Sequence, residues 1–338
     1  MGHVTDPHAI VASWGHDWRT ALPVRTPAEQ SALLAETREV IAQLQNAART
    51  DGSAGRALHR KSILETDSAT FEVAAMVPEQ LQVGPFTPGA VWRAALRFSS
   101  AFPLPRPDEE ADQRGLGVRI GDGVRRLDLL ATTGEAHHAR DAPAMLASLR
   151  AAAAASRGGV EGRLGALAIL VRTLGPKDGL RMARTISRAA QSRVSLAAMT
   201  FYSRAPFRMG EFAVRYRFVP VGKVKETVRG SGPHALATDL RARLTEGALS
   251  WSFDLQGYLD ARSTPMDDHR VAWRSPWLPT ATLLVRGEGR SAPPVALRAA
   301  PSWTPGAANG AVLDPLGDLN MLRGVAYEVS QTGRGAVG

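Results

Sequence analysis

The chain has 338 residues, 44% of them hydrophobic, and a formal net charge of +9 at neutral pH. This composition is ordinary for a globular protein with a substantial core in one large domain or two. The sequence contains no cysteine, which excludes disulfides, zinc–thiolate sites, iron–sulfur clusters and any other thiolate-bound metal.

The positive charge comes from 41 basic residues, nearly all arginine, against 32 acidic ones. These arginines are dispersed among alanine, leucine and valine instead of forming a run interleaved with aromatic residues, so nucleic-acid binding is not predicted. Arginine also pairs well with carboxylates, so buried arginines could serve an acidic ligand. Neither an export signal nor an apolar run of about 18 residues is present, so a cytoplasmic location away from membranes is expected.

A long helix is predicted near the N-terminus, over residues 26–49. Thr26 and Glu29 form a capping-box pattern, and Pro27 occupies the first helical position. Short segments that partly alternate between polar and apolar residues follow, separated by glycine, proline and aspartate. They are predicted as strands, over residues 69–77, 94–100, 114–121 and 124–131.

The middle of the chain differs, because it is rich in alanine, leucine and arginine. This composition predicts helices, over residues 141–156, 160–174 and 176–193. Strands return after it, around one further helix, with a short helix at the end of the chain. The strands are predicted over 212–222, 249–260 and 280–287, and the helices over 233–247 and 318–332.

This order of elements predicts an α+β fold, most simply an antiparallel β-barrel with helices packed outside it. The predicted division of the chain is an N-terminal extension and helix over residues 1–50 and a main domain over 51–338. The main domain carries a helical insertion at about 141–200. The glycines near residue 115 lack the spacing and setting of a dinucleotide-binding loop.

Two arginines flank a tyrosine in the last predicted helix. Arg323 and Arg334 lie four residues before and seven after Tyr327, a spacing that would place all three side chains on one face if the segment is helical. One interpretation is an amphipathic helix with solvated arginines. The other is a tyrosinate, because a neighbouring guanidinium and a ferric iron would together favour ionisation of a phenol whose pKa is ordinarily about 10.

A second set of candidates precedes and enters the predicted barrel. His59 follows Arg56 by three residues, and Arg97 and Ser99 are two apart on a strand and therefore share a face. Taken alone, His59 is better explained as a surface or hydrogen-bonded structural histidine than as a functional one.

Five segments in order resemble the successive haem-site segments of the haem catalase family. They are RALHRKS, RFSS, DQRGLGVRI, LDLLATTGEAHHARD and RGVAYEVSQTGR, which begin at residues 56, 97, 112, 127 and 323. Residues 247–273 and 275–285 also resemble the end of the barrel in the short catalase-related peroxidases. The resemblance extends over about residues 50–335 and implies a catalase-like barrel that binds haem b.

The resemblance implies a role for each matching residue. Tyr327 matches the proximal tyrosinate on the haem iron, and Arg323 matches the arginine that stabilises it. His59 matches the distal histidine, and Ser99 matches the serine that orients its ring. The arginines near the haem propionates are matched by Arg56, Arg97 and Arg334.

The sequence also departs from the family pattern. Thr132 stands where the distal asparagine is usual, and His137 and His138 replace the paired phenylalanines of the peroxide channel. Met145 replaces the phenylalanine stacked over the haem. These changes make the distal side more polar and less rigid, unless the loop has moved and Thr132 does not face the haem.

The main functional hypothesis is a haem peroxidase that reduces hydrogen peroxide or organic hydroperoxides with a small organic electron donor, with weak or no catalase activity. One alternative is a hydroperoxide rearrangement like that of the allene oxide synthases, which keep the asparagine that this chain lacks. Another is a haem-binding descendant without turnover. A monomer or homodimer is expected.

Overall fold

The computed structural model describes residues 6–47, 55–122, 125–190, 193–287 and 312–334. Its strands are β1 Ser62–Val73, β2 Val91–Ser100, β3 Arg114–Gly121, β4 Arg126–Thr133, β5 Phe201–Tyr202, β6 Phe207–Met209, β7 Phe212–Pro220, β8 Leu249–Gly257, β9 Trp277–Val285 and β10 Val312–Pro315. Its helices are α1 Pro7–Ala12, α2 Pro27–Ala47, α3 Ala142–Ala155, α4 Gly159–Ala189, α5 Ala235–Glu246 and α6 Gly317–Thr332.

Within these ranges the strands form one antiparallel sheet that closes on itself. The order β7–β5–β4–β3–β2–β1–β9–β8 is completed by pairing of β7 with β8, and β6 and β10 extend the sheet beyond β7. The eight-stranded barrel with helices outside it confirms the predicted α+β class.

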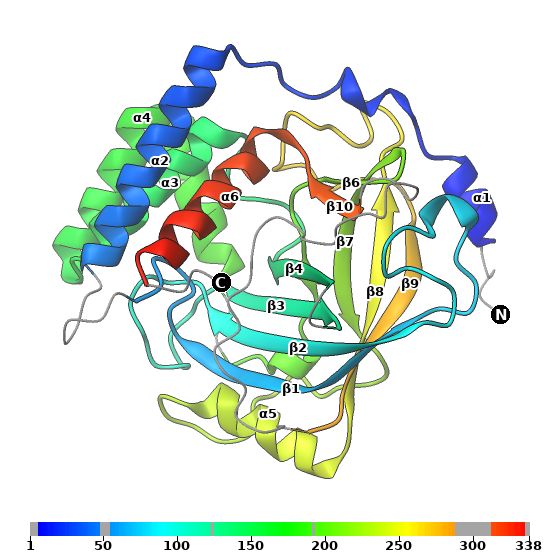
Figure 1. Cartoon of the computed structure of the whole chain (residues 1–338). Helices are drawn as coiled ribbons and strands as arrows, with labels where there is room; N and C mark the ends of the chain where they lie inside the picture. The colour runs from blue at the N-terminus through cyan, green and yellow to red at the C-terminus, as the bar shows by residue number, and fades with distance from the viewer. Residues whose placement is uncertain (1–5, 48–54, 123–124, 191–192, 288–311, 335–338) are drawn as a thin grey trace.

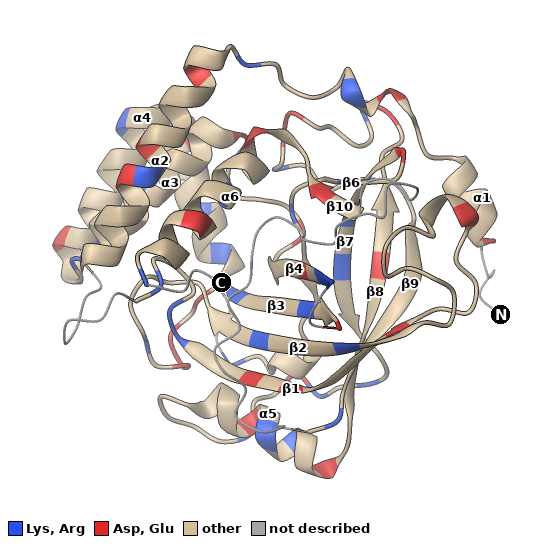
Figure 2. Ribbon diagram, viewed as in Figure 1, with Lys and Arg blue, Asp and Glu red and all other residues tan. Residues whose placement is uncertain are grey.

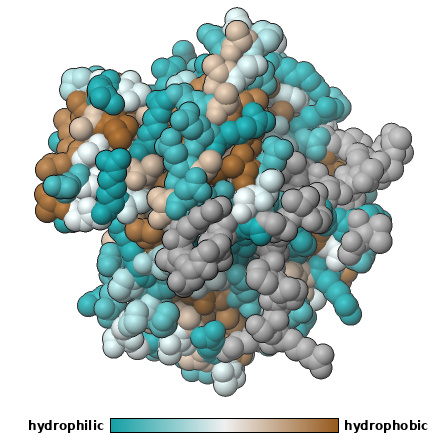
Figure 3. Space-filling view, turned by 60° about the vertical axis from the view of Figure 1, so that its left-hand side comes forward, coloured by the Kyte–Doolittle hydropathy of each residue, from teal (hydrophilic) through white to brown (hydrophobic). Residues whose placement is uncertain are grey.

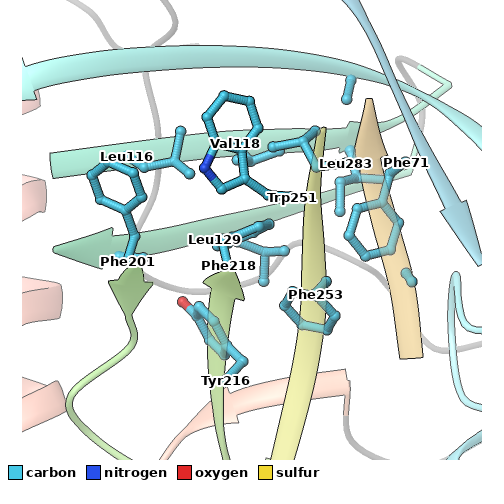
Figure 4. Packing of buried hydrophobic residues seen from close by; sticks show 14 of the residues in the cluster. Phe71, Leu116, Val118, Leu129, Phe201, Tyr216, Phe218, Trp251, Phe253 and Leu283 are labelled. Carbon is cyan, nitrogen blue, oxygen red and sulfur yellow. The ribbon is translucent and has the colours of Figure 1, made fainter. Parts of the chain in front are cut away.

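Large apolar side chains fill the barrel interior, as Figure 4 shows. They come from alternate positions of the strands, because successive side chains point to opposite faces of a sheet. Phe253 lies at the centre of this packing, with ring centroids 5.3 Å from Phe71 and 5.2 Å from Phe218. Side chains fill an eight-stranded barrel of this kind, so a large flat ligand has to bind outside it.

Helices α2, α3, α4 and α6 gather on one side of the barrel, whereas α5 lies at another edge (Figure 1). The capping box at the start of α2 is formed, with Thr26 N donating to Glu29 Oε2 at 2.9 Å and Glu29 N donating to Thr26 Oγ1 at 3.3 Å. Helix α2 packs on α6 through an apolar cluster that includes Ile41, Leu44 and Leu322. Hydrophilic side chains cover much of the face shown in Figure 3, with hydrophobic patches between them.

The structure differs from the sequence-based expectation in a few places. The predicted break at Gly175 is present, however: within the range of α4 the backbone of Gly175 is non-helical (φ 81°) before Pro176, so two helices meet there at a kink. Strands β5, β6 and β10 were not predicted, because two to four residues give no readable alternation.

The predicted division of the chain between residues 50 and 51 lies outside the described residues. Helices α3 and α4 occupy most of the range 141–200, and the assignment of that range as an insertion stays a prediction. No helix in the described ranges is both long enough and apolar enough to cross a membrane.

Candidate functional site

The outer face of strands β2, β3 and β4 carries the first group of candidate residues. Ser99, Gly115 and Thr132 lie directly opposite one another across the three strands. Residues opposite one another in an antiparallel sheet point to the same face. In the next row, Arg97, Gly117 and Leu130 are aligned in the same way, so a glycine at the centre of both rows leaves β3 without a side chain there.

His59 lies over this face, just before β1. Its Nδ1 is 3.0 Å from Ser99 Oγ, and its carbonyl oxygen accepts a hydrogen bond from Arg97 Nη2 at 2.8 Å. A Cβ on Gly115 would lie 2.6 Å from the imidazole Nδ1 and Cε1, so only glycine admits the ring at this position. His59 also has a positive φ of 53°, an uncommon conformation that occurs more often at functional sites.

Tyr327 reaches the same barrel face from α6. Its half-buried side chain packs against Leu130, one row away from Ser99. Helix α6 is fixed on the segment that follows β5, because Asn320 Nδ2 donates to Pro206 O at 2.6 Å and Arg323 Nη1 donates to Ser203 O at 3.1 Å. The structure therefore brings the tyrosine and the histidine, 268 positions apart in the sequence, onto neighbouring rows of one face.

Three of the predicted arginines form a basic cluster beside Tyr327. Burial, followed by repulsion from Arg56 and Arg97, lowers the pKa of Arg334 to about 10. Burial, followed by repulsion from Arg56, likewise lowers the pKa of Arg97 to about 10, although Glu65 Oε1 accepts a hydrogen bond from Arg97 Nε at 2.9 Å. These pKa shifts show that the cluster would gain from an additional anion.

Thr132 lies on the same row as Ser99 and interacts with a residue that the sequence did not reveal. Its Oγ1 accepts a hydrogen bond from Arg204 Nη1 at 3.2 Å, while Arg204 Nη2 donates to Ala136 O at 3.0 Å and lies 3.5 Å from His138 Nδ1. Arg204 is buried, and burial followed by repulsion from Arg323 lowers its pKa to about 9. One arginine among many dispersed ones gives no spacing signal that could have identified it.

The two histidines of the predicted channel stack on each other beside Arg204. The ring centroids of His137 and His138 are 4.3 Å apart, and His138 Nε2 is 3.1 Å from Ser148 Oγ. Met145 belongs to the same turn of α3, where its sulfur lies 3.6 Å from Ser148 Oγ. A further histidine that the sequence did not single out, His269, accepts a hydrogen bond from His137 N through its carbonyl oxygen at 2.8 Å.

The buried histidines predict acid sensitivity. Burial is the main cause that lowers the pKa of His59, His138 and His269 to about 3 and that of His137 well below its ordinary value of 6.5. In the unfolded chain these groups bind protons below about pH 6.5, whereas in the folded chain they stay neutral, so the free energy of unfolding falls as the pH drops from about 6.5 towards 3.

Urea denaturation at pH 7.5, 6 and 5 measures this dependence. His269→Gln removes one of the four groups and is expected to reduce the slope of the unfolding free energy against pH. An unfolding free energy that is constant between pH 7.5 and 5 would contradict the assignment of these histidines as neutral.

The donor set of this face fits a haem. An oxygen ligand is available from Tyr327, a basic cluster suits two propionates, and the imidazole of His59 is held beside Ser99 on the same face.

Solved structures with a similar fold are catalases. A bacterial catalase aligns with 84% of this chain at a TM-score of 0.65 and 15% identity, and the alignment covers 58% of the catalase. A fungal catalase aligns with 85% of this chain at a TM-score of 0.64 and 14% identity, covering 60% of its own length. Catalase A from Saccharomyces cerevisiae aligns with 85% of this chain at a TM-score of 0.63 and 14% identity, and the alignment covers 62% of that catalase.

The chain therefore has the catalase fold, and the predicted resemblance is confirmed at the level of the fold. It spans about three fifths of the length of these catalases. No protein-family model matches the sequence, and the comparison with curated proteins found no match.

Proposed function

We propose that the protein is a haem-dependent peroxidase that reduces hydrogen peroxide or an organic hydroperoxide with electrons from a small organic donor. The observation that carries the proposal is the placement of His59 with Ser99 and of Tyr327 on neighbouring rows of one barrel face, beside a cluster of arginines. The catalase fold supports it.

Tyr327 would hold the iron through its phenolate oxygen, and the basic cluster would bind the propionates. The propionate ligands would be Arg56, Arg97 and Arg334. Arg323 lies one turn before Tyr327 on α6 and would favour the ionised phenol. When bound, haem supplies the iron redox chemistry that peroxide reduction requires.

His59 would move the proton. Burial is the main cause that lowers its pKa to about 3, so the imidazole is neutral at physiological pH and a ring nitrogen has a free lone pair. With Nδ1–H donating to Ser99 Oγ, the lone pair of Nε2 is available to accept the hydroperoxide proton. The same imidazole then returns that proton to the oxygen that departs when the O–O bond breaks.

The overall reaction balances with a two-electron donor. The hydroperoxide takes up two electrons and two protons and yields an alcohol, or water from hydrogen peroxide, together with one water. Thr132 accepts a hydrogen bond from Arg204, which leaves its own hydroxyl proton as one donor towards the substrate.

The polar surroundings of Thr132 favour donor oxidation over dismutation. Dismutation requires a second hydrogen peroxide to be bound and oriented, for which Thr132, His137 and His138 provide no fixed amide donor and no apolar channel. We therefore expect readily measured oxidation of a phenolic donor and slow oxygen evolution. Thr132→Asn, which introduces an amide, is expected to raise oxygen evolution about five- to tenfold, the effect of one additional hydrogen bond.

An oxygen electrode measures both proteins, with Thr238→Asn as the matched control because Thr238 is exposed on α5, away from this face. Oxygen evolution by the wild type at the rate of a fast catalase would reject the peroxidase assignment. A pyridine haemochrome assay tests the more basic claim, and protein that binds no added haem would reject it.

Product analysis separates the remaining candidates. An enzyme that rearranges hydroperoxides converts a fatty-acid hydroperoxide without consuming a donor, whereas a haem-binding protein without turnover leaves the hydroperoxide intact. Consumption of donor in proportion to hydroperoxide is the result expected of a peroxidase.

A further inference from the structure

A second site candidate lies on the barrel wall, at the far end of the face that carries Tyr327. It is a hollow of about 560 Å³ formed where β1, β2, β3 and β4 lie side by side. This volume is within the usual range for small-molecule pockets, about 300–1,000 Å³. Its lining includes five arginines: Arg93, Arg119, Arg125, Arg126 and Arg286.

Neighbouring carboxylates hold part of this lining in place. Arg119 forms two hydrogen bonds of 2.8 Å with Asp128, through Nε and Nη2. Arg125 binds Asp122 in the same manner, at 3.1 and 2.8 Å. These pairs fix two guanidinium groups at the wall, so part of a basic surface exists before any ligand binds.

The opposite wall is held by Arg286. Its Nη1 donates to Thr70 Oγ1 at 2.9 Å, and its Nη2 lies 3.2 Å from Glu72 Oε1. Asp67 is the acidic residue of the lining itself. Three of the five arginines, Arg119, Arg125 and Arg286, thus pair with carboxylates of Asp128, Asp122 and Glu72.

Arg93 extends this basic surface. It lies on β2 opposite Thr70 of β1, and its exposed side chain makes no hydrogen bond or ion pair with any residue that the structure describes. Arg93 and Arg97 point to the same face of β2 with Ala95 between them. Figure 2 shows the basic positions along β2 and β3.

The hollow adjoins the candidate haem site. Ala95 lines the hollow and also packs against Leu130, the residue that Tyr327 contacts. Basic side chains therefore continue from the cluster around Arg97 into the hollow.

We propose that this hollow binds a small molecule that carries two or more carboxylate or phosphate groups. Guanidinium groups bind both kinds of oxyanion through paired hydrogen bonds. Several arginines on separate strands fit a ligand with more than one anionic group better than a single small anion. The proposal is independent of the peroxidase assignment, because it requires neither iron nor turnover.

Isothermal titration calorimetry on the full chain, with its haem content measured beforehand, tests the proposal. The probes are citrate, which carries carboxylates only, and inorganic pyrophosphate, which carries phosphates only. We expect at least one probe to bind, and Arg93→Ala to weaken its binding roughly 10- to 100-fold, the effect of losing a charge-assisted hydrogen-bonded contact. The difference between the two probes identifies the preferred oxyanion.

Two further variants distinguish specific binding of the probe in this hollow from nonspecific attraction of an anion to a positively charged protein. Arg163→Ala removes the same charge from an exposed position on α4 and is expected to leave binding unchanged. Arg93→Lys keeps the charge but loses the planar guanidinium group with its paired donors, so an affinity between those of the wild type and Arg93→Ala is expected. Absence of binding by both probes, or equal weakening in Arg93→Ala and Arg163→Ala, would overturn the proposal.

Discussion

Tyr327→Phe is expected to weaken haem binding by at least about 100-fold, because loss of a direct ligand exceeds the 10- to 100-fold effect of losing a residue that only orients one. The phenyl ring still fills the space against Leu130, so the fold is expected to remain intact. Titration of the apoprotein with haem measures the affinity, and resonance Raman spectra of the ferric form report the loss of the tyrosinate ligand.

The matched control is Tyr258→Phe, which removes the same atom from a buried tyrosine that packs against Trp273, outside the site. It is expected to bind haem as the wild type does. An unchanged Raman spectrum in Tyr327→Phe would show that another residue binds the iron, and His137 and His138 would then be the first to examine.

Much of the fold could be predicted from the sequence because the long helices and strands have strong local sequence patterns. The capping box at Thr26 and Glu29 predicted the start of α2, and the predicted C-terminal helix, 318–332, differs from α6 by one residue. The short strands β5, β6 and β10 could not be predicted in this way, because each depends on pairing with distant strands more than on its own residues.

The candidate site could be predicted from the sequence only in part. The row of Ser99, Gly115 and Thr132 depends on the register of β2, β3 and β4. The family resemblance of the segments DQRGLGVRI and LDLLATTGEAHHARD implied this register without specifying it. Arg204 and His269 enter the site through tertiary packing alone, and neither has a sequence neighbour that indicates it. The polar contacts of Thr132 with Arg204 could therefore be described only from the structure.

Gly115, between Ser99 and Thr132 in the same row, determines whether the His59 ring can occupy its position. A Cβ at position 115 would lie 2.6 Å from the His59 ring and 3.0 Å from Ser99 Oγ, so the ring cannot keep its place if residue 115 is alanine. Gly115→Ala therefore removes the proposed base from its position while every polar atom of the site remains present.

His59→Ala is expected to retain haem while slowing the reaction with hydrogen peroxide by about 10²- to 10⁴-fold, the contribution of a positioned proton carrier. Gly115→Ala is expected to show a loss of the same order, because in both variants no imidazole stands beside Ser99. Stopped-flow absorption measures the rates, and haem content is determined for each protein.

Gly324→Ala is the matched control, since a Cβ at this position of α6 meets no other atom within 4 Å. It is expected to react as the wild type does, and alanine in a helix interior should not weaken the fold. A normal rate in His59→Ala would reject His59 as the base. A slow His59→Ala variant together with a normal Gly115→Ala variant would instead show that the imidazole acts from a position other than the one beside Ser99. Only slow reaction in both variants, with haem retained, agrees with proton transfer by His59 at the place where Gly115 admits it.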